Sequence, residues 1–158
     1  MLVFFIKFDR LNKNSFNDNI KSPLLGKTIP ELNLIKIDKN KIINFKKYKD
    51  KQFAVNFFAS WCQPCKIEAP ILDKISYYID IIGISYKDSE KDMKDFLKSY
   101  GNPYTEIGID KTGSIAIEWG VYGVPETFLI NNGKIIYKHT GPITHSDLHD
   151  NILPLIKK

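Results

Sequence analysis

Arginine is the scarcest charged residue of this 158-residue chain. Only Arg10 among the 23 basic residues is an arginine, and 18 acidic residues leave a formal net charge of +5. The guanidinium fork that grips phosphates and bases is therefore almost absent, and the lysines are scattered among Asp and Glu instead of forming a stripe. We predict a solvated surface and no nucleic-acid partner.

Long apolar runs are missing as well. The opening segment 1–6 is apolar, but it is far shorter than the roughly 20 residues that cross a bilayer, and it lacks the basic start and cleavage site of a complete secretory signal. Residues 12–22 are rich in Asn, Lys, Asp and Ser, which is typical of a linker. We expect residues 1–23 to form an arm, either disordered or the remnant of a membrane anchor plus linker, and residues 24–158 to form one domain.

Alternating and continuous apolar segments predict an α/β domain. Segments 31–37 and 41–45 alternate like the strands of a half-solvated hairpin, whereas 53–58 is nearly continuously apolar and predicts a central strand. Further strands are expected at 81–85, 127–130 and 134–137, the last two around an Asn-Asn-Gly turn. Helical spacing predicts helices over 66–79, 89–100, around 114–119 and over 144–157, with Pro154 kinking or fraying the last.

Cysteine is limited to Cys62 and Cys65, directly after the predicted central strand and at the start of a helix. Positions i and i+3 share a helix face with Cβ atoms about 5–6 Å apart, and slight tightening brings them to the roughly 3.8 Å of a disulfide. So short a loop constrains the unfolded chain little, which makes a purely structural bridge a weak explanation. The pattern favours a pair that opens and closes.

The position of each sulfur predicts its role. Cys62 should lie at the helix N-terminus, where free amides and the helix dipole stabilise a thiolate, so we assign it as the nucleophile. Cys65, one turn deeper, would resolve the mixed disulfide and release a reduced partner. Pro64 suits the first helical turn, where no amide hydrogen bond is lost.

Two other interpretations of the cysteines stay open. A zinc site would need about four ligands, and the chain offers this pair with His139, His145 and His149 at spacings unlike those of zinc fingers. The second interpretation is that both cysteines are buried and inert. Their position at a strand-to-helix junction and the flanking Trp61 argue against it. His145 and His149, at i and i+4 on a terminal helix, are expected to be solvated.

A family resemblance carries the argument further. The segment Phe57-Phe-Ala-Ser-Trp-Cys-Gln-Pro-Cys-Lys-Ile-Glu-Ala-Pro70 resembles the active-site signature of extracytoplasmic thioredoxin-like proteins. Ser85-Tyr-Lys-Asp88, Tyr100-Gly-Asn-Pro-Tyr104 and above all Gly120-Val-Tyr-Gly-Val-Pro-Glu-Thr-Phe-Leu-Ile130 are similar to the cytochrome c maturation branch, the CcmG/DsbE family. The resemblance runs from about Leu24 to the C-terminus. It implies a thioredoxin fold, a central mixed β-sheet flanked by helices, with the predicted hairpin as an N-terminal extension.

The resemblance also implies a function. Members of this family are dithiol reductants that keep the haem-attachment cysteines of apocytochrome c reduced, directly or through other maturation proteins, and an upstream membrane thiol reductant recharges them. They face the periplasm from an inner-membrane anchor, of which only an incomplete segment would be present here. We accordingly expect a monomeric protein disulfide reductase that has no cofactor and no metal.

Individual site residues follow from the resemblance. Val124-Pro125 matches the cis-proline beside the disulfide, where the Val124 backbone would receive a substrate strand. Glu68 and Glu126 match acidic positions that would tune the cysteines, because nearby carboxylates disfavour a thiolate and can pass protons. Two ordinary surface glutamates and a routine trans turn are the alternatives.

Two further residues are placed by the same comparison. Asn56 stands where thioredoxin carries a buried acid, so proton transfer should not use that position. Trp61 should shield the site and contact partners.

Three alternative functions remain at this stage. Another extracytoplasmic or cytoplasmic thioredoxin-like reductase would share all the redox chemistry and differ in its clients. A noncatalytic thioredoxin-fold adaptor that binds apocytochrome or a chaperone is the second, although the intact Cys62 and Cys65 argue against it. A peroxidase is the third, and segment 58–61 lacks the Pro and Thr arrangement of peroxiredoxin-like sites.

Overall fold

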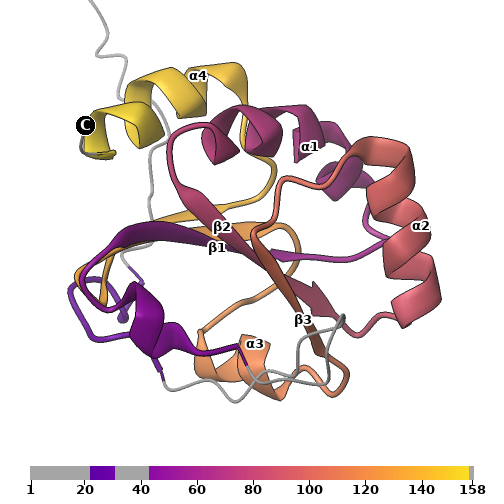
Figure 1. Cartoon of the computed structure of the whole chain (residues 1–158), viewed down its shortest axis with the longest axis horizontal. Coiled ribbons are helices and arrows are strands. Elements are labelled where there is room, and N and C mark those ends of the chain that lie inside the picture. The colour runs from indigo at the N-terminus through magenta and orange to yellow at the C-terminus, as the bar shows by residue number, and fades with distance from the viewer. Residues whose placement is uncertain (1–21, 31–42, 157–158) are drawn as a thin grey trace, which may run out of the picture.

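A computed structural model of the chain describes residues 22–30 and 43–156. Its centre is a five-stranded sheet in the order β3-β2-β1-β4-β5 (Figure 1). The strands are β1 (Gln52–Phe58), β2 (Asp80–Tyr86), β3 (Glu106–Asp110), β4 (Glu126–Asn131) and β5 (Lys134–Thr140). β1, β2 and β3 are parallel, whereas β4 runs antiparallel to β1 and β5 antiparallel to β4. The mixed sheet confirms the predicted fold class.

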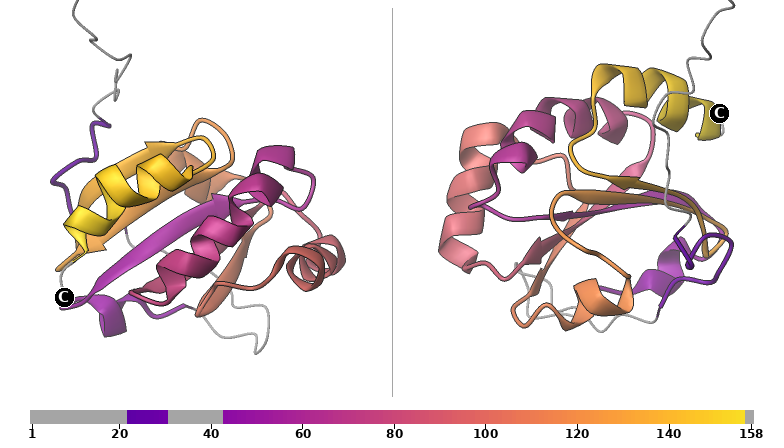
Figure 2. Two further views of the ribbon diagram at one scale, coloured as in Figure 1. Left: turned by 90° about the horizontal axis from the view of Figure 1, so that it is seen from above. Right: turned by 180° about the vertical axis from the view of Figure 1, so that it is seen from behind.

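Helices cover both faces of this sheet. They are α1 (Gln63–Ser76), α2 (Glu90–Tyr100), α3 (Ser114–Glu118) and α4 (His145–Asp147), together with a 3₁₀ turn at Phe45–Tyr48. Figures 1 and 2 show α1, α2 and α4 on one side of the sheet and α3 on the other. Each face has its own apolar core, so β1 is buried over nearly its whole length, as its continuous apolar sequence predicts.

The alternation of β1 side chains divides these two cores. Ala54 and Phe58 pack on the face of α1, whereas Phe53, Val55 and Phe57 pack on the face of α3. Since successive side chains of a strand point to opposite faces, Asn56 also points toward α1. A single polar residue is thereby placed in the middle of the α1 face.

One close approach fixes where the segment before β3 crosses the sheet. The ring of Tyr104 lies against Gly83 of β2, where a Cβ atom would stand 2.8 Å from the ring carbon Cγ. Because real Cβ contacts are never so short, only glycine lets the buried Tyr104 side chain reach across β2. The phenol ring stacks on Phe58, with 4.7 Å between the ring centroids, and points toward the middle of the α1 face.

Several element predictions need correction. Segment 31–37 and residues 41–42 lie outside the described residues. The strand predicted over 41–45 is wrong where it can be checked, because residues 43–44 are not in a strand and Phe45 begins a 3₁₀ turn. β3 was not predicted, because its alternating sequence is short and ends in two acids that turn out to be buried, Glu106 and Asp110. The helical spacing of Ile67, Ile71, Leu72 and Ile75 predicts one buried face for α1, but Ile67 is 65% exposed because the buried stripe passes through Glu68 instead.

The C-terminal helix is real but irregular. After α4 the chain makes a π-helical turn over Leu148–Ile152 and a 3₁₀ turn over Leu153–Leu155, which contains Pro154. The departure from α-helical geometry agrees with the kink or fraying expected from that proline. His145 and His149 are exposed, as predicted.

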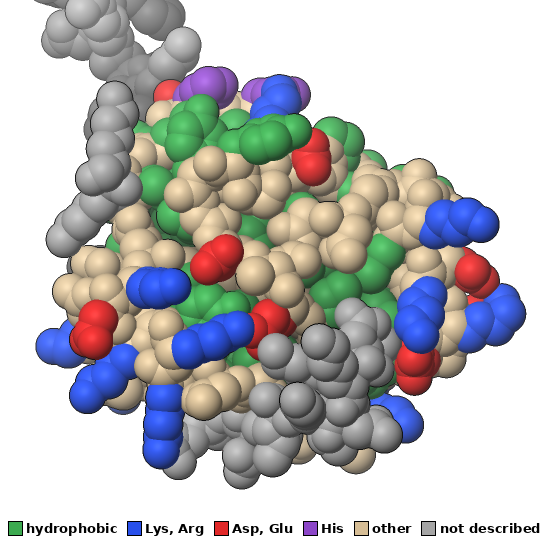
Figure 3. Space-filling model, in the orientation of Figure 1, with side chains coloured by type: hydrophobic (Ala, Val, Ile, Leu, Met, Phe, Trp, Pro, Cys, Tyr) green, Lys and Arg blue, Asp and Glu red, His purple; other side chains and the backbone are tan. Residues whose placement is uncertain are grey.

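The surface, the segment before β1 and the helices add three observations. On the face shown in Figure 3, blue lysine side chains are interspersed with acidic ones, as the sequence indicates. Residues 26–29 line the edge of β5, where the Gly26 amide donates to the Ile135 carbonyl at 2.8 Å. Across residues 22–30 and 43–156, no helix combines the length and the apolarity needed to cross a bilayer.

Candidate active site

The two cysteines form a disulfide at the junction of β1 and α1. Their Cα atoms are 5.3 Å apart, and both side chains are buried, with 3% and 2% of the surface of Cys62 and Cys65 exposed. β1 ends at Phe58, and α1 begins at Gln63 with Pro64 in its first turn. The helix start thus lies five residues after the central strand, and it carries the disulfide to the end of the sheet.

Cys62 is the N-cap of α1. The amide N–H of Cys65 donates to Cys62 Sγ at 3.2 Å, so sulfur takes the acceptor position that Ser, Thr or Asp usually fills. The same amide would stabilise a negative charge on Cys62 once the disulfide is reduced. The amide thus lies at the sulfur that the sequence analysis assigns as the nucleophile.

The loop before β4 closes over Cys62. Val124–Pro125 is a cis peptide bond, and the Val124 carbonyl oxygen lies 3.5 Å from Cys62 Sγ. Pro125 is buried, whereas the preceding Tyr122 is 80% exposed and Val124 is half-buried. The Val124 backbone therefore borders the sulfur that an incoming chain would have to reach.

Trp61 flanks the disulfide on the surface and is 59% exposed. Its indole N–H donates to the Lys87 carbonyl at 3.3 Å. Ser60 is fixed by Asp88, whose carboxylate accepts hydrogen bonds from the Ser60 amide and hydroxyl, both at 2.7 Å. A surface groove begins at Trp61 and follows α2 to Phe96 and Tyr100.

Glu68 is wholly buried one helical turn after Cys65. Its Oε1 accepts from Asn56 Nδ2 at 2.9 Å, and its Oε2 accepts from the Ile143 amide at 3.1 Å. Burial raises the pKa of Glu68 to about 7, although the hydrogen bonds from Ile143 and Asn56 oppose that rise. A carboxyl that titrates near neutrality in this place can hold or release a proton beside the dithiol.

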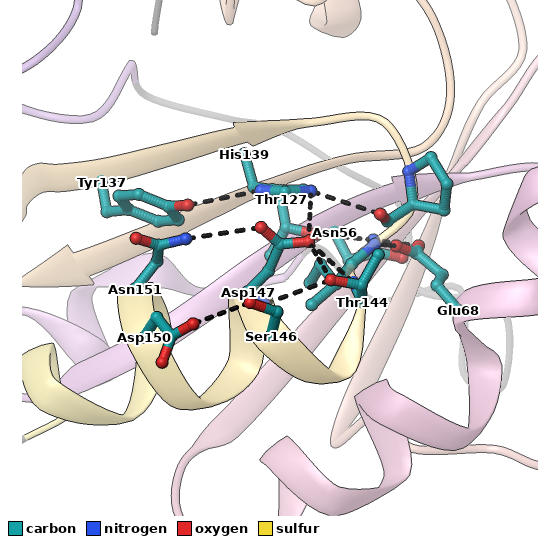
Figure 4. A network of polar contacts seen from close by, with 12 residues as sticks. Asn56, Glu68, Thr127, Tyr137, His139, Thr144, Ser146, Asp147, Asp150 and Asn151 are labelled. Carbon is teal, nitrogen blue, oxygen red and sulfur yellow. Dashed lines mark hydrogen bonds and ion pairs between the residues drawn. The ribbon is translucent and has the colours of Figure 1, made fainter. Parts of the chain in front are cut away.

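Asn56 organises the polar groups of the α1 face, as Figure 4 shows in part. The amide nitrogen that donates to Glu68 also donates to Thr127 Oγ1 at 2.9 Å, and the amide oxygen accepts from the Tyr104 hydroxyl at 2.8 Å. An asparagine offers two N–H donors and an acceptor oxygen, which all have partners here. Asn56 therefore holds Glu68 and does not itself titrate.

Glu126 is also wholly buried, but its partners differ. Its Oε2 forms an ion pair with Lys138 Nζ at 2.8 Å, and its Oε1 accepts from the Tyr122 amide at 2.9 Å. Lys138 Nζ donates in addition to the Gly120 carbonyl at 2.7 Å. The buried pair thus fastens both ends of the 120–122 turn that precedes Val124.

The two acids lie on opposite faces of the sheet. Thr127, next to Glu126 on β4, bonds to Asn56 on the α1 face, so Glu126 points to the α3 face, where Phe128 also packs. Neither acid is an ordinary surface glutamate. The structure brings Glu68 into the polar network below the cysteines, whereas Glu126 supports the loop that carries Val124.

Three residues of this site were missed by the sequence analysis. Tyr104 and Lys138 contact Asn56 and Glu126 from positions 48 and 12 residues away along the chain, and His139, considered only as a zinc ligand, adjoins the loop that bonds to Glu68. Such long-range partners leave no local pattern. Tyr104 ends the segment 100–104 that contributed to the family resemblance, but it was given no role there, and the strand predicted over 134–137 stopped short of Lys138 and His139.

Comparison with known proteins agrees with this geometry. The Redoxin family pattern matches residues 24–152. The thiol:disulfide interchange protein CycY of Rhizobium leguminosarum bv. viciae is 44% identical over 113 residues, which cover 70% of this chain and 61% of CycY. DsbE of Vibrio cholerae serotype O1 is 35% identical over 155 residues, which cover 94% of this chain and 84% of that protein.

The lengths of these relatives and one solved structure complete the comparison. The chain spans only 61% and 59% of CycY and of the DsbE homolog of Paracoccus denitrificans, less than two thirds of each. The crystal structure of a DsbE-type protein from Chlorobium tepidum has a TM-score of 0.69 at 23% identity and covers 79% of this chain and 90% of its own. At that identity the likeness shows the fold alone.

Proposed function

The chain belongs to the Redoxin family and, within it, to the DsbE-type thiol:disulfide interchange proteins, and from this premise we propose that it is the dithiol reductant of cytochrome c maturation. Its client would be apocytochrome c, whose haem-attachment cysteines it would reduce directly or through maturation partners. It would act in the periplasm from an inner-membrane anchor and receive its electrons from an upstream membrane thiol reductant.

The proposed cycle uses only the two sulfurs and protons. In the reduced protein, the Cys62 thiolate attacks one sulfur of the client disulfide, and the other client sulfur leaves as a thiolate that takes up a proton. The Cys65 thiol loses its proton and attacks Cys62 Sγ, which breaks the mixed disulfide. The client departs as a dithiol. The protein has given two electrons to the client and is left with the Cys62–Cys65 disulfide.

Glu68 is the observation that carries the reductive direction. A buried carboxyl with a pKa of about 7 lies one turn after Cys65 and is available to accept the proton that Cys65 must lose. Once ionised, it disfavours a second negative charge on the dithiol, which stabilises the disulfide relative to the thiolate. Both effects favour a protein that gives electrons to its client.

The client would approach along the loop before β4. The Val124 carbonyl borders Cys62, and the cis Val124–Pro125 bond leaves that backbone facing the sulfur. Trp61, next to Cys62 in the chain, and Tyr122, two residues before Val124, offer exposed aromatic surface. We assign substrate contact to Trp61, Val124 and Pro125, and support of their loop to Glu126.

The reduction potential of the Cys62–Cys65 couple tests the direction. It should lie nearer the roughly −270 mV of thioredoxin than the roughly −120 mV of a dedicated oxidant when it is equilibrated with glutathione. A potential at the oxidant end would overturn the proposal. The C65S variant should then trap a mixed disulfide with an oxidised haem-attachment peptide of the Cys-X-X-Cys-His type.

The client assignment needs its own control. A control peptide with one more residue between its two cysteines should react at least tenfold more slowly with the wild-type protein. Equal rates would contradict a dedicated apocytochrome reductant and favour a generic reductase. Binding of the apocytochrome peptide that is unaffected by loss of both sulfurs would instead favour the noncatalytic adaptor.

A further inference from the structure

One peptide group joins His139 to Glu68. The carbonyl oxygen of Pro142 lies 3.3 Å from His139 Nε2, and the amide nitrogen of the next residue, Ile143, donates to Glu68 Oε2 at 3.1 Å. These two atoms belong to the same planar peptide unit, so its orientation is set from both sides at once. Figure 4 shows His139 of β5 and Glu68 of α1 on either side of the loop that carries this unit.

The hydrogen-bond partners of His139 select one arrangement of the ring protons. A carbonyl oxygen only accepts, so Nε2, which faces Pro142, must carry a proton. Nδ1 lies 3.3 Å from the Tyr137 hydroxyl, which can donate to it in the neutral ring. The Nε2–H tautomer satisfies both contacts together, and it aims a donor at the Pro142 carbonyl.

The loop is fixed again on its other side. The Thr144 amide and hydroxyl donate to Asp147 Oδ2 at 2.9 and 2.6 Å, and the Asp147 amide donates back to the Thr144 hydroxyl at 3.2 Å. This capping box starts α4 directly after Ile143. The peptide between Pro142 and Ile143 is thus held between His139 and the start of α4.

We propose that His139 is a positioning residue of the redox site, which holds the Ile143 amide on Glu68 through the Pro142 carbonyl and so governs how readily Glu68 releases its proton. The inference rests on the proposed role of Glu68, but the hydrogen bond itself can be tested without it. It adds a position on β5, far from the cysteines in sequence, to the groups that set the chemistry of the site.

The polar and charged groups around Glu68 and His139 are the other groups that could influence the titration of Glu68. Glu68 faces Asn56 of β1, the Tyr104 hydroxyl beyond Asn56 and the Ile143 amide, and on α1 it follows Cys65. His139 faces Tyr137 of its own strand and Asp147 of α4, whose Oδ2 lies 3.9 Å from Nε2.

Asp147 can compensate the charge of a protonated ring. Burial acts to raise the pKa of Asp147, but the hydrogen bonds from Thr144 and the charge of His139 hold it below its usual value. Asp147 is therefore ionised across the neutral range, and its own titration does not overlap that of Glu68.

The decisive experiment compares His139→Leu with His139→Gln in the reduced protein. The Glu68 carboxyl carbon is followed by NMR against pH in uniformly ¹³C-labelled protein, with Glu68→Gln used to assign its signal. Without the ring donor, the Ile143 amide should leave the carboxylate, and the Glu68 titration midpoint should move up by about one pH unit. Glutamine keeps an N–H donor at similar reach, so H139Q should restore at least half of that difference.

Two further variants serve as controls. His149→Leu removes an exposed histidine from the same end of the chain and should leave the Glu68 midpoint unchanged. Tyr137→Phe removes only the hydroxyl that faces Nδ1 and should move the midpoint upward by less than H139L does, which keeps the proposal testable if H139L fails to fold. An unchanged midpoint in folded H139L, or equal shifts in H139L and H139Q, would overturn the inference.

The rate of thiol-disulfide exchange against pH separates this inference from the proposed function. Its inflection should move upward with the Glu68 midpoint in H139L. If the midpoint moves and the rate profile does not, His139 still positions the amide, and it is the proposed role of Glu68 in exchange that fails. If neither moves while E68Q abolishes the inflection, the role of Glu68 stands and that of His139 fails.

Discussion

At the scale of single residues, the site contains two buried carboxyls that avoid the cost of an isolated charge in different ways. Glu126 is paired with Lys138, whereas within residues 22–30 and 43–156 Glu68 forms no ion pair, and burial raises its pKa to about 7. A buried ion without a partner is so unfavourable that the group tends to stay protonated instead. Glu68 is thereby the acid of the pair suited to proton exchange.

Tyr104→Phe tests the network that holds Glu68. The lost hydroxyl leaves the Asn56 amide oxygen without its donor in a buried place, which should lower the free energy of unfolding by about 1–3 kcal/mol. Urea denaturation of the oxidised protein measures it. Tyr77→Phe is the matched control, because Tyr77 is 78% exposed, and its effect should stay within about 0.5 kcal/mol. Equal effects of the two variants would show that the Tyr104 hydroxyl has no structural role.

At the scale of elements, β5 supplies the partners of both acids from consecutive residues. Lys138 reaches Glu126 on the α3 face, and His139 contacts the Pro142 carbonyl that leads to Glu68 on the α1 face. Strand alternation sends neighbouring side chains to opposite faces, so one strand can serve two separate groups. A shift of β5 by one residue would exchange these two partners.

Lys138→Met tests the support of the loop before β4. The change leaves the Glu126 carboxylate buried without its cation, which should lower the free energy of unfolding by about 3–5 kcal/mol. The double variant K138M/E126Q should recover most of that loss. Denaturant unfolding of the three proteins measures both effects, with the exposed Lys134→Met as control. A double variant no more stable than K138M would contradict the pairing.

The elements predicted correctly are those in which the spacing of apolar residues indicates which side chains are buried. The continuous run of β1 and the spacing of α2 match the structure to within about one residue at each end, and Ser89 caps α2. β3 escaped because its buried ends are Glu106 and Asp110, and the Asp110 carboxylate accepts from the Gly113 amide at the start of α3. Burial of a charged residue depends on a distant partner, which local periodicity does not contain.

The site was predictable to the same degree. Cys62 and Cys65 carry their chemistry in their spacing. The tuning role of Glu68 and Glu126 was suggested only by resemblance to a family, and their burial was not predicted. Tyr104, Lys138 and His139 act across the sheet from strands or loops far away in sequence. Their roles emerge only when the register of β1, β4 and β5 is known.

At the scale of the whole molecule, the two faces of the sheet hold different parts of the site. The α1 face contains the disulfide, Asn56 and Glu68, together with a core that includes Phe58, Leu72 and Met93. The α3 face contains Glu126 and Lys138 against the Phe57–Trp119–Phe128 aromatic cluster, whose ring centroids are 5.1 to 5.9 Å apart. The dithiol can thus be tuned from one face while the loop that borders it is anchored on the other.

The titration of Glu68 makes the stability of the whole fold depend on pH. The folded state binds the Glu68 proton more tightly than the unfolded state, since the pKa is about 7 in one and 4.5 in the other. Its stabilising contribution is therefore complete below pH 4.5, declines between pH 4.5 and 7, and is absent above pH 7. The total loss should be about 3 kcal/mol, which follows from 1.36 kcal/mol for each pH unit between the two values.

The oxidised protein, unfolded in urea at pH 4.5, 6 and 8, gives the measurement, with Glu68→Gln as the reference. Subtraction of the E68Q values removes the pH dependence that other groups contribute. Asp147 is one of them, and because its pKa is lowered, its contribution is lost only in more acidic solution. The difference between wild type and E68Q should fall steadily toward pH 8. A difference that stays constant or rises would mean that Glu68 is ionised in the fold throughout this range, and would remove the buried proton on which the reductive cycle depends.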